Sequence, residues 1–312
     1  MSFFSRARPG QPTTRRVRGF LGLPGELRNQ IYQYVFQSDF RCEIAAKGSS
    51  FVQRRAKTVK LWAGAFATTT NKGVKYTSEV SQKPPITLRM SRQLGKYTAV
   101  QGLQTKWSTS LFAIHLVCKQ LHAETLPWIY SKTTFVFDSS TRMSNFLNVV
   151  PKSNLDHITK FEMHYTTYGC PRLLDDCTWQ AKHNKSWLAA CNTASKKLTG
   201  LRTLKICLRV TENAPRFNLR QPWVLPLLQF RRRKEGLDTV TIDFRTRRSG
   251  CSFDGREEVA RASEHLHKLF GDAVRAAILG AKEEEAMSGF QAAWDGDYYM
   301  WQFHLGYAST GW

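Results

Sequence analysis

The chain has 312 residues, of which 42% are hydrophobic, and this is enough to bury the core of one large domain or two small ones. It contains no run of 18 or more apolar residues, so we expect no membrane-spanning segment. The formal net charge is +22, from 46 Lys and Arg residues against 24 Asp and Glu residues, and such an excess is typical of proteins that meet polyanions.

The cysteines and the N-terminus bear on the compartment. Seven Cys residues, an odd number at wide spacing, predict reduced thiols in an intracellular protein of the nucleus or cytoplasm, not a disulfide framework. Arg15, Arg16 and Arg18 interrupt the start before any long apolar stretch, which argues against a secretory signal. A mitochondrial transit peptide stays an alternative because residues 1–25 contain five Arg and no acid, although prolines there oppose the amphipathic helix that such peptides form.

The positive charge is concentrated in the N-terminal part of the chain. Residues 1–123 hold 20 Lys and Arg residues against four acids, a net charge of +16. This favours a polyanionic partner, namely nucleic acid, an acidic protein or an anionic membrane surface. The alternative is a solvated basic arm, and we expect residues 1–19 to be disordered because they show no hydrophobic periodicity.

The first predicted element is a short amphipathic helix within residues 20–37. Pro24 and Glu26 suit its first turn, because the φ of proline is already helical and the helix dipole favours a carboxylate there. The apolar stripe recurs every four residues and consists of Leu27, Ile31 and Val35. A helix of about three turns is unstable alone, so another element must cover this stripe.

The predicted cover is a second helix at residues 111–126, which Pro127 ends or kinks. Its apolar face consists of Ile114, Val117, Cys118, Leu121 and Thr125. A β-branched and aromatic strand follows at residues 133–137.

The two helices together resemble the F-box-like module of a family of fungal proteins. The resemblance rests on LPGELRNQIYQYVF, which starts at Leu23, and on LVCKQLHAETLPWIYSKTTFVF, which starts at Leu116. In an F-box, exposed apolar residues of such helices dock on the Skp-type adaptor of a cullin ubiquitin ligase. The resemblance therefore implies adaptor binding through Leu23, Pro24, Leu27, Ile31, Val35, Val117, Cys118 and Leu121. This chain departs from an ordinary F-box by a long insert between the helices, and the alternative interpretation is that both helices are simply core.

The insert between the two helices is basic and poor in acids. A strand is expected at residues 38–46, where apolar and charged residues alternate. Residues 47–110 then form either a flexible insert or an extended hairpin, with a possible short strand at residues 85–90.

From residue 133 onwards, strand-like and helix-like runs alternate, which predicts an α/β fold. The strands are expected at residues 133–137, 157–165, 201–210 and 237–245, and the helices at 140–150, 184–198, 222–234 and 257–279. Three strand starts share a turn residue, a Leu, two polar residues and an apolar residue, at 154–158, 200–204 and 236–240. The recurrence favours an irregular βα arc that looks like a degenerate leucine-rich repeat, and the alternative is an ordinary α/β sheet with helices on one or both sides.

These patterns divide the chain into four predicted regions. They are a disordered basic tail (1–19), an F-box-like module (20–137) that includes the basic insert at about 47–110, a βα domain (138–288) and an aromatic C-terminal segment (289–312). The last segment contains eight aromatic residues. We expect it to cap the end of the sheet, with a docking surface as the alternative.

The sequence offers no motif for catalysis. It contains no phosphate loop of the GxxxxGK type, no GxSxG elbow and no HExxH pair. Two loose groups of potential metal ligands lack the close Cys pairs of zinc modules: His115, Cys118 and His122, and His164, Cys170, Cys177, His183 and Cys191. We therefore expect no catalytic residue, no cofactor and no metal, and a protein that is not an enzyme.

The predicted function follows from the resemblance and not from a chemical site. It is that of a substrate-recognition adaptor of a cullin-type ubiquitin ligase, which binds a Skp-type adaptor through the F-box-like helices and an unknown target protein through the βα domain. The alternative is a basic, non-enzymatic scaffold that binds nucleic acid or acidic protein through its N-terminal third.

Overall fold

The computed structural model describes residues 19–37, 39–45, 86–90, 114–232, 236–247, 253 and 256–307. Residues 1–18 of the predicted disordered tail and most of the predicted basic insert lie outside the described residues. The chain divides into two compact units, residues 1–37 and residues 38–312, and each is considered by itself. None of the helices in the described ranges has the length and apolar character needed to cross a bilayer.

The first unit contains a short 3-10 turn, η1 (Phe20–Gly22), and the helix α1 (Gly25–Val35), which confirms the predicted first helix. Pro24 directly precedes α1 and Glu26 lies in its first turn, as expected from helix electrostatics. The side chains of Tyr32 and Phe36 are fully buried, and the Tyr32 ring lies 5.8 Å from that of Phe20. The predicted stripe is less buried than these two residues, because Leu27 is 45% exposed and Ile31 and Val35 are half-buried.

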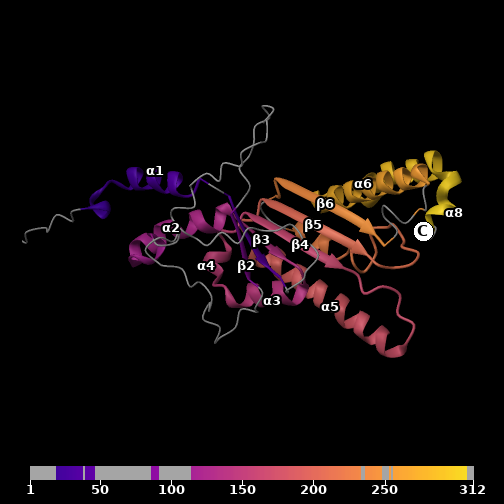
Figure 1. The fold of residues 1–312 in the computed structure, drawn as a ribbon, viewed down its shortest axis with the longest axis horizontal. Coiled ribbons are helices and arrows are strands. Elements are labelled where there is room, and N and C mark those ends of the chain that lie inside the picture. Colours follow the sequence, from indigo (N-terminus) through magenta and orange to yellow (C-terminus); the bar gives the residue numbers. More distant parts are fainter. Residues whose placement is uncertain are drawn as a thin grey trace, which may run out of the picture. The chain divides into compact units, whose positions relative to one another are not determined.

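The second unit is built on a parallel sheet, which comprises six strands in the described chain, in the order β2-β1-β3-β4-β5-β6 (Figure 1). The strands are β1 (Phe40–Ile44), β2 (Ile86–Met90), β3 (Thr133–Phe137), β4 (Lys160–Thr166), β5 (Thr203–Val210) and β6 (Thr239–Thr246). All six strands were predicted within a few residues, including the short strand inside the insert. Since β1 and β3 pair in the same sheet as β4, the domain boundary predicted after residue 137 runs through a continuous sheet.

The helices of the second unit follow one another along the sheet. They are α2 (Lys119–Lys132), α3 (Ser140–Val149), α4 (Lys152–Leu155), α5 (Leu174–Lys197), the 3-10 helix η5 (Leu227–Arg232) and α6 (Glu257–Leu279). The predicted bounds of α6 are confirmed, and its 23 residues bury one continuous apolar face.

Helices α3, α5 and α6 pack on the same face of the sheet. Phe146 of α3 contacts Phe137 of β3, at 5.2 Å between ring centroids. Trp187 of α5 stacks on Tyr165 of β4, with 4.3 Å between the ring centroids. On α6, the ring of Phe270 contacts that of Phe244 of β6, at 5.0 Å between centroids. Phe137, Tyr165 and Phe244 all belong to the buried alternate positions of their strands, so one face of the sheet carries the core.

The strand register corrects one of the three repeated strand starts. Lys160 pairs with Thr203, and Thr203 pairs with Thr239, so Ile158 is equivalent to Leu201 and Leu237. The backbone bonds agree, because the amide of Thr203 donates to the oxygen of Thr159 (2.8 Å) and the amide of Thr239 donates to that of Arg202 (3.1 Å). The starts at 200 and 236 are therefore equivalent, whereas the predicted start at 154 is three residues early and lies partly within α4.

Two helices differ from the prediction for reasons that involve proline. The predicted helix at 111–126 begins only at Lys119 and continues through Pro127, because burial of Leu121 and Thr125 outweighs the one lost amide bond. The predicted helix at 222–234 is a chain of turns that ends in η5, since Pro226 within it disfavours an α-helix. Helix α5 begins ten residues before the predicted start, with Asp175 and Asp176 in its first turn.

The aromatic C-terminal segment packs on the core in part. Helix α7 (Glu283–Ala292) packs against α6. It is followed in the chain by a π-helical turn, η7 (Ala293–Asp297), and by the short elements η8 (Tyr299–Trp301) and α8 (Gln302–Leu305). The rings of Phe290, Trp294 and Tyr307 are buried, and Tyr307 lies 4.7 Å from Phe217. The rings of Tyr299 and Phe303 are 68% and 91% exposed, so the segment is both a cap and an exposed aromatic surface.

Candidate functional site

The candidate site is the face of the sheet opposite the packed helices. Alternate residues of β4, β5 and β6 place polar side chains there, and we call this surface the open face; it consists of Lys160, Glu162, His164, Lys205, Cys207, Arg209, Thr241, Asp243 and Arg245. Lys205 and Arg245 are 46% and 67% exposed, so solvent reaches this surface over β5 and β6. At the β1 and β3 end, by contrast, Glu43 and Val136 are buried.

Glu162 is the centre of an ionic network on the open face, although its side chain is only 3% exposed. Arg41 of β1 donates from Nη1 to Oε2 (2.6 Å) and from Nη2 to Oε1 (3.1 Å). His164 Nε2 lies 2.8 Å from Oε1, and Lys205 Nζ lies 3.6 Å from the same oxygen. Burial by itself would raise the pKa of Glu162, but the hydrogen bonds from His164 and Arg41 and the charges of Arg41 and Lys205 outweigh it and hold the pKa well below its usual range.

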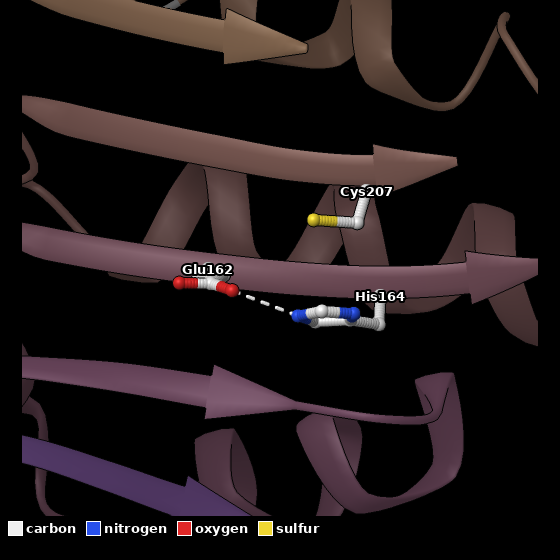
Figure 2. Close-up of side chains that lie close together, drawn as sticks. All are labelled: Glu162, His164 and Cys207. Carbon is white, nitrogen blue, oxygen red and sulfur yellow. Dashed lines mark hydrogen bonds and ion pairs between the residues drawn. The ribbon is translucent and has the colours of Figure 1, made fainter. Parts of the chain in front are cut away.

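Cys207 lies beside this network because His164 of β4 and Cys207 of β5 are register partners. Ligand atoms of Glu162, His164 and Cys207 all lie within 4.8 Å of one another. Figure 2 shows the three side chains on the same side of the two strands, with helical ribbon behind the strands. Burial raises the pKa of the Cys207 thiol to about 12, and the nearby Glu162 charge adds to this, so the thiol is protonated at neutral pH and is a poor nucleophile.

The second group of potential ligands considered from sequence does not converge. His164 lies on the open face, whereas Cys191 is fully buried on α5, which packs on the opposite face. His183 of α5 stacks on Tyr165 at 5.1 Å, also on the helix side of the sheet. The sheet therefore separates His164 from these residues, and its actual neighbour is Cys207.

Of the other group considered from sequence, His115, Cys118 and His122, only the two histidines lie together. His115 lies in the 3-10 turn η4 (Ile114–Leu116), and its ring is 3.9 Å from that of His122 on α2. Its Nδ1 is 2.9 Å from the hydroxyl of Thr125. Burial lowers the pKa of His115 to about 4, with the His122 charge as the second cause, so the His115 ring is neutral near pH 7. Cys118 is the residue that precedes α2 and belongs to no metal-ligating cluster found in the described ranges.

The residues implied in adaptor binding differ in exposure. In the first unit, Leu27 is 45% exposed and Pro24 is exposed, while Leu23, Ile31 and Val35 are half-buried. In the second unit, Val117 is 68% exposed and Cys118 is half-buried. Leu121 is only 4% exposed, so it offers almost no surface to a partner.

An apolar groove of about 910 Å³ lies between α5 and the turns that precede β6. Leucine and proline side chains dominate its lining, with Lys185 and Arg231 as its charged members; the apolar lining residues are Leu188, Pro222, Leu225, Pro226 and Leu228. Its lining residues include no acid, His or Cys, so Lys185 has no acid–base partner among them.

A family model supplies the relationship to known proteins. The model of the domain of unknown function DUF7730 matches residues 17–225, which is more than half of the chain. The chain belongs to the DUF7730 family. The match to DUF7730 begins before α1 and extends through β5. It therefore includes the motif that starts at Leu23 and the strands that carry Glu162, His164 and Cys207. No curated protein and no solved structure matched the chain in the corresponding comparisons.

Sequence reasoning missed the Glu162 network. Glu162 and His164 are two residues apart on a predicted strand, which was a sufficient signal that they share a face. No such signal indicates that Cys207 lies beside His164 or that Arg41 reaches Glu162. These pairs are 43 and 121 residues apart in the chain, and only the strand register brings them together.

Proposed function

We propose that this protein is a non-catalytic recognition subunit of a cullin-type ubiquitin ligase, with apolar residues of α1 and of the Val117 segment as its contacts to a Skp-type adaptor. The supporting observation is the exposure of Leu27 and Val117, at 45% and 68%, in the two motifs that resemble an F-box. This exposure leaves both side chains accessible to a partner, as a docking role requires. The contact set is Leu23, Pro24, Leu27, Ile31, Val35, Val117 and Cys118, without the buried Leu121.

The open face supports the second half of this proposal, the presentation of a target protein. Parallel strands with helices on one side leave a broad polar surface, and the exposed charges on β5 and β6 suit a protein surface of complementary charge. The Glu162–Cys207 surroundings hold no activated nucleophile, since the thiol is protonated at neutral pH. A binding role therefore accounts for more of the observed features than a hydrolytic or transfer activity does.

The adaptor contact is tested by binding of purified Skp-type adaptor to the full chain at moderate ionic strength, which suppresses charge-driven background. Leu27→Asp and the double variant Leu23→Ala/Pro24→Ala are expected to abolish binding. Leu174→Asp is the matched control, because Leu174 is an 88% exposed leucine on α5 that belongs to neither motif. Unchanged binding by Leu27→Asp and by the double variant would refute the docking model.

A second candidate, a scaffold for nucleic acid or acidic protein, is favoured by one observation on the open face. Arg209 and Arg245 are register partners on β5 and β6, so two Arg residues are neighbours on the open face, and Asp243 pairs with only one of them, Arg245. The excess positive charge at this place would attract a polyanion. We expect the double variant Arg209→Ala/Arg245→Ala to weaken DNA or RNA binding and to flatten its salt dependence, and equal affinity at low and physiological salt for the wild type would exclude this candidate.

A further inference from the structure

The open face holds three different metal-ligating side chains at one place. Strand alternation brings Glu162 and His164 to the same face of β4, and the parallel register sets Cys207 beside His164. Their ligand atoms lie within 4.8 Å of one another, although the three residues come from two strands. The next residue in this row, Asp243, pairs with Arg245 at 3.1 Å and does not belong to this cluster.

We propose that Glu162, His164 and Cys207 form a binding site for a borderline divalent cation of the Zn²⁺ type. A carboxylate oxygen, an imidazole nitrogen and a thiolate sulfur are the three kinds of ligand that Zn²⁺ accepts, and hard cations such as Mg²⁺ or Ca²⁺ disfavour the sulfur. Binding would displace the proton of the Cys207 thiol, so uptake of the cation releases a proton. The His164 side chain is 21% exposed and Cys207 is half-buried, so both ligands are partly open to solvent. A water molecule would complete a tetrahedral set with the three protein ligands.

Arg41 would act as the outer partner of the ligating carboxylate. Its shorter bond, 2.6 Å from Nη1, goes to Oε2, and its longer bond, 3.1 Å from Nη2, goes to Oε1, the oxygen that His164 approaches. The two bonds fix the plane of the carboxylate, and Figure 2 shows one of its oxygens directed at the His164 ring. Hydrogen bonds of this kind to a ligating carboxylate orient the ligand for its metal.

Lys205 opposes the cation and gives the proposal a directional test. Its Nζ lies 3.6 Å from Oε1, so its charge competes with a metal for the same oxygen. Lys205 is 46% exposed, and its side chain is free to turn toward water when the oxygen is taken. Lys205→Met is therefore expected to tighten metal binding several-fold. If the cluster only balances the buried charge of Glu162, the same substitution leaves the metal affinity unchanged.

The experiment is a titration of the metal-free full chain with Co²⁺ in a thiol-free reductant, followed by competition with Zn²⁺. The wild type is expected to bind one Co²⁺ with the absorption band of cobalt–thiolate bonding, which Zn²⁺ then removes. Cys207→Ser is expected to lose this band and His164→Gln to weaken binding at least tenfold. Cys170→Ser is the matched control, because Cys170 is an exposed thiol outside the cluster, and it should behave as the wild type.

Three results would overturn the site. They are no thiolate band in the wild type, a band that survives Cys207→Ser, and a band that disappears in Cys170→Ser. Circular dichroism melts of each variant show whether it is folded, and Zn²⁺ should raise the melting temperature of the wild type but not of Cys207→Ser. None of these readouts involves a Skp-type adaptor, so the metal site and the ligase proposal stand or fall separately.

Discussion

Arg41 of β1 reaches across β3 to form a bidentate ion pair with Glu162 of β4, at 2.6 Å and 3.1 Å. The two residues are 121 positions apart, and the strand between them contributes Val136, which is fully buried. The pair therefore links β1, which precedes the basic insert, across β3 to β4, and these last two strands follow the insert. It also balances a carboxylate that burial alone would neutralise.

Loss of one partner of this pair should cost more than loss of both. Arg41→Met leaves Glu162 buried with fewer donors, and we expect it to lower the free energy of unfolding by about 3 kcal/mol. Arg41→Met/Glu162→Gln should recover part of this loss. Urea unfolding of the four proteins in a double-mutant cycle measures the coupling. Arg261→Met is the control, because its ion pair with Glu257 is largely exposed and is worth at most about 1 kcal/mol; a similar cost for the two Arg substitutions would contradict the assigned role of Arg41.

Two glycines at equivalent strand starts should respond differently to alanine. A Cβ at Gly200 would overlap the backbone oxygen of Asp156, whereas a Cβ at Gly236 meets no atom within 4 Å. We expect Gly200→Ala to lower the free energy of unfolding by at least about 1 kcal/mol, and Gly236→Ala to leave it nearly unchanged. Thermal or urea unfolding of both variants provides the comparison. Equal effects would show that the two strand starts are not packed as described.

His267 should make stability depend on pH below neutrality. Burial, and secondarily the charge of Arg245, lowers its pKa to about 4, and its Nε2 lies 3.0 Å from the Tyr307 hydroxyl and 3.2 Å from that of Thr246. An unfolded His titrates near about 6.5, so the folded state prefers the neutral ring. This contribution is fully present above about pH 6.5 and is lost as the pH falls toward 4, by up to about 3 kcal/mol.

The measurement is the free energy of unfolding from pH 7 to pH 5 for the wild type and His267→Gln. His115 titrates in the same range, so only the difference between the two proteins reports on His267. We expect the stability of the variant to fall less steeply as the pH is lowered. Parallel curves would mean that His267 is not held neutral by its surroundings.

The second F-box-like motif contains one core residue and one surface residue, which can be separated by stability. Leu121 is 4% exposed and Val117 is 68% exposed. Leu121→Ala is expected to cost about 2–5 kcal/mol, and Val117→Ala less than about 0.5 kcal/mol. Chemical denaturation checks both values. A large cost for Val117→Ala would indicate that this residue is covered and is unsuited to dock on a partner.

Local patterns predicted most of the fold because they arise from short-range physics. The bounds of β3 and α6 follow from a β-branched and aromatic run and from a continuous amphipathic stripe. The predictions at Pro127 and Pro226 failed in opposite directions. A helix was expected to end or kink at Pro127 but continues through it, whereas the helix expected across Pro226 does not form. Packing decides whether a helix tolerates a proline. Buried Leu121 and Thr125 hold α2 together around Pro127, whereas the turns around Pro226 remain 3-10 in character.

The site was less predictable because it depends on long-range register. The start at residue 154 matched the motif of Gly200 and Gly236, yet pairing of Lys160 with Thr203 shifts the equivalent position to residue 157. His164 was grouped with Cys191 by proximity in sequence, but the sheet lies between them and Cys207 is the true neighbour. A strand pattern assigns faces, whereas neighbours across strands come only from the register.

The most direct test of the ligase proposal is the mass of the complex formed by the full chain and a purified Skp-type adaptor, measured by size-exclusion chromatography with light scattering at moderate salt. We expect a stable one-to-one complex with the wild type and separate proteins with Leu27→Asp. Separate elution of the wild-type chain and the adaptor would refute adaptor binding. In that case the helices of the F-box-like motifs serve the architecture alone.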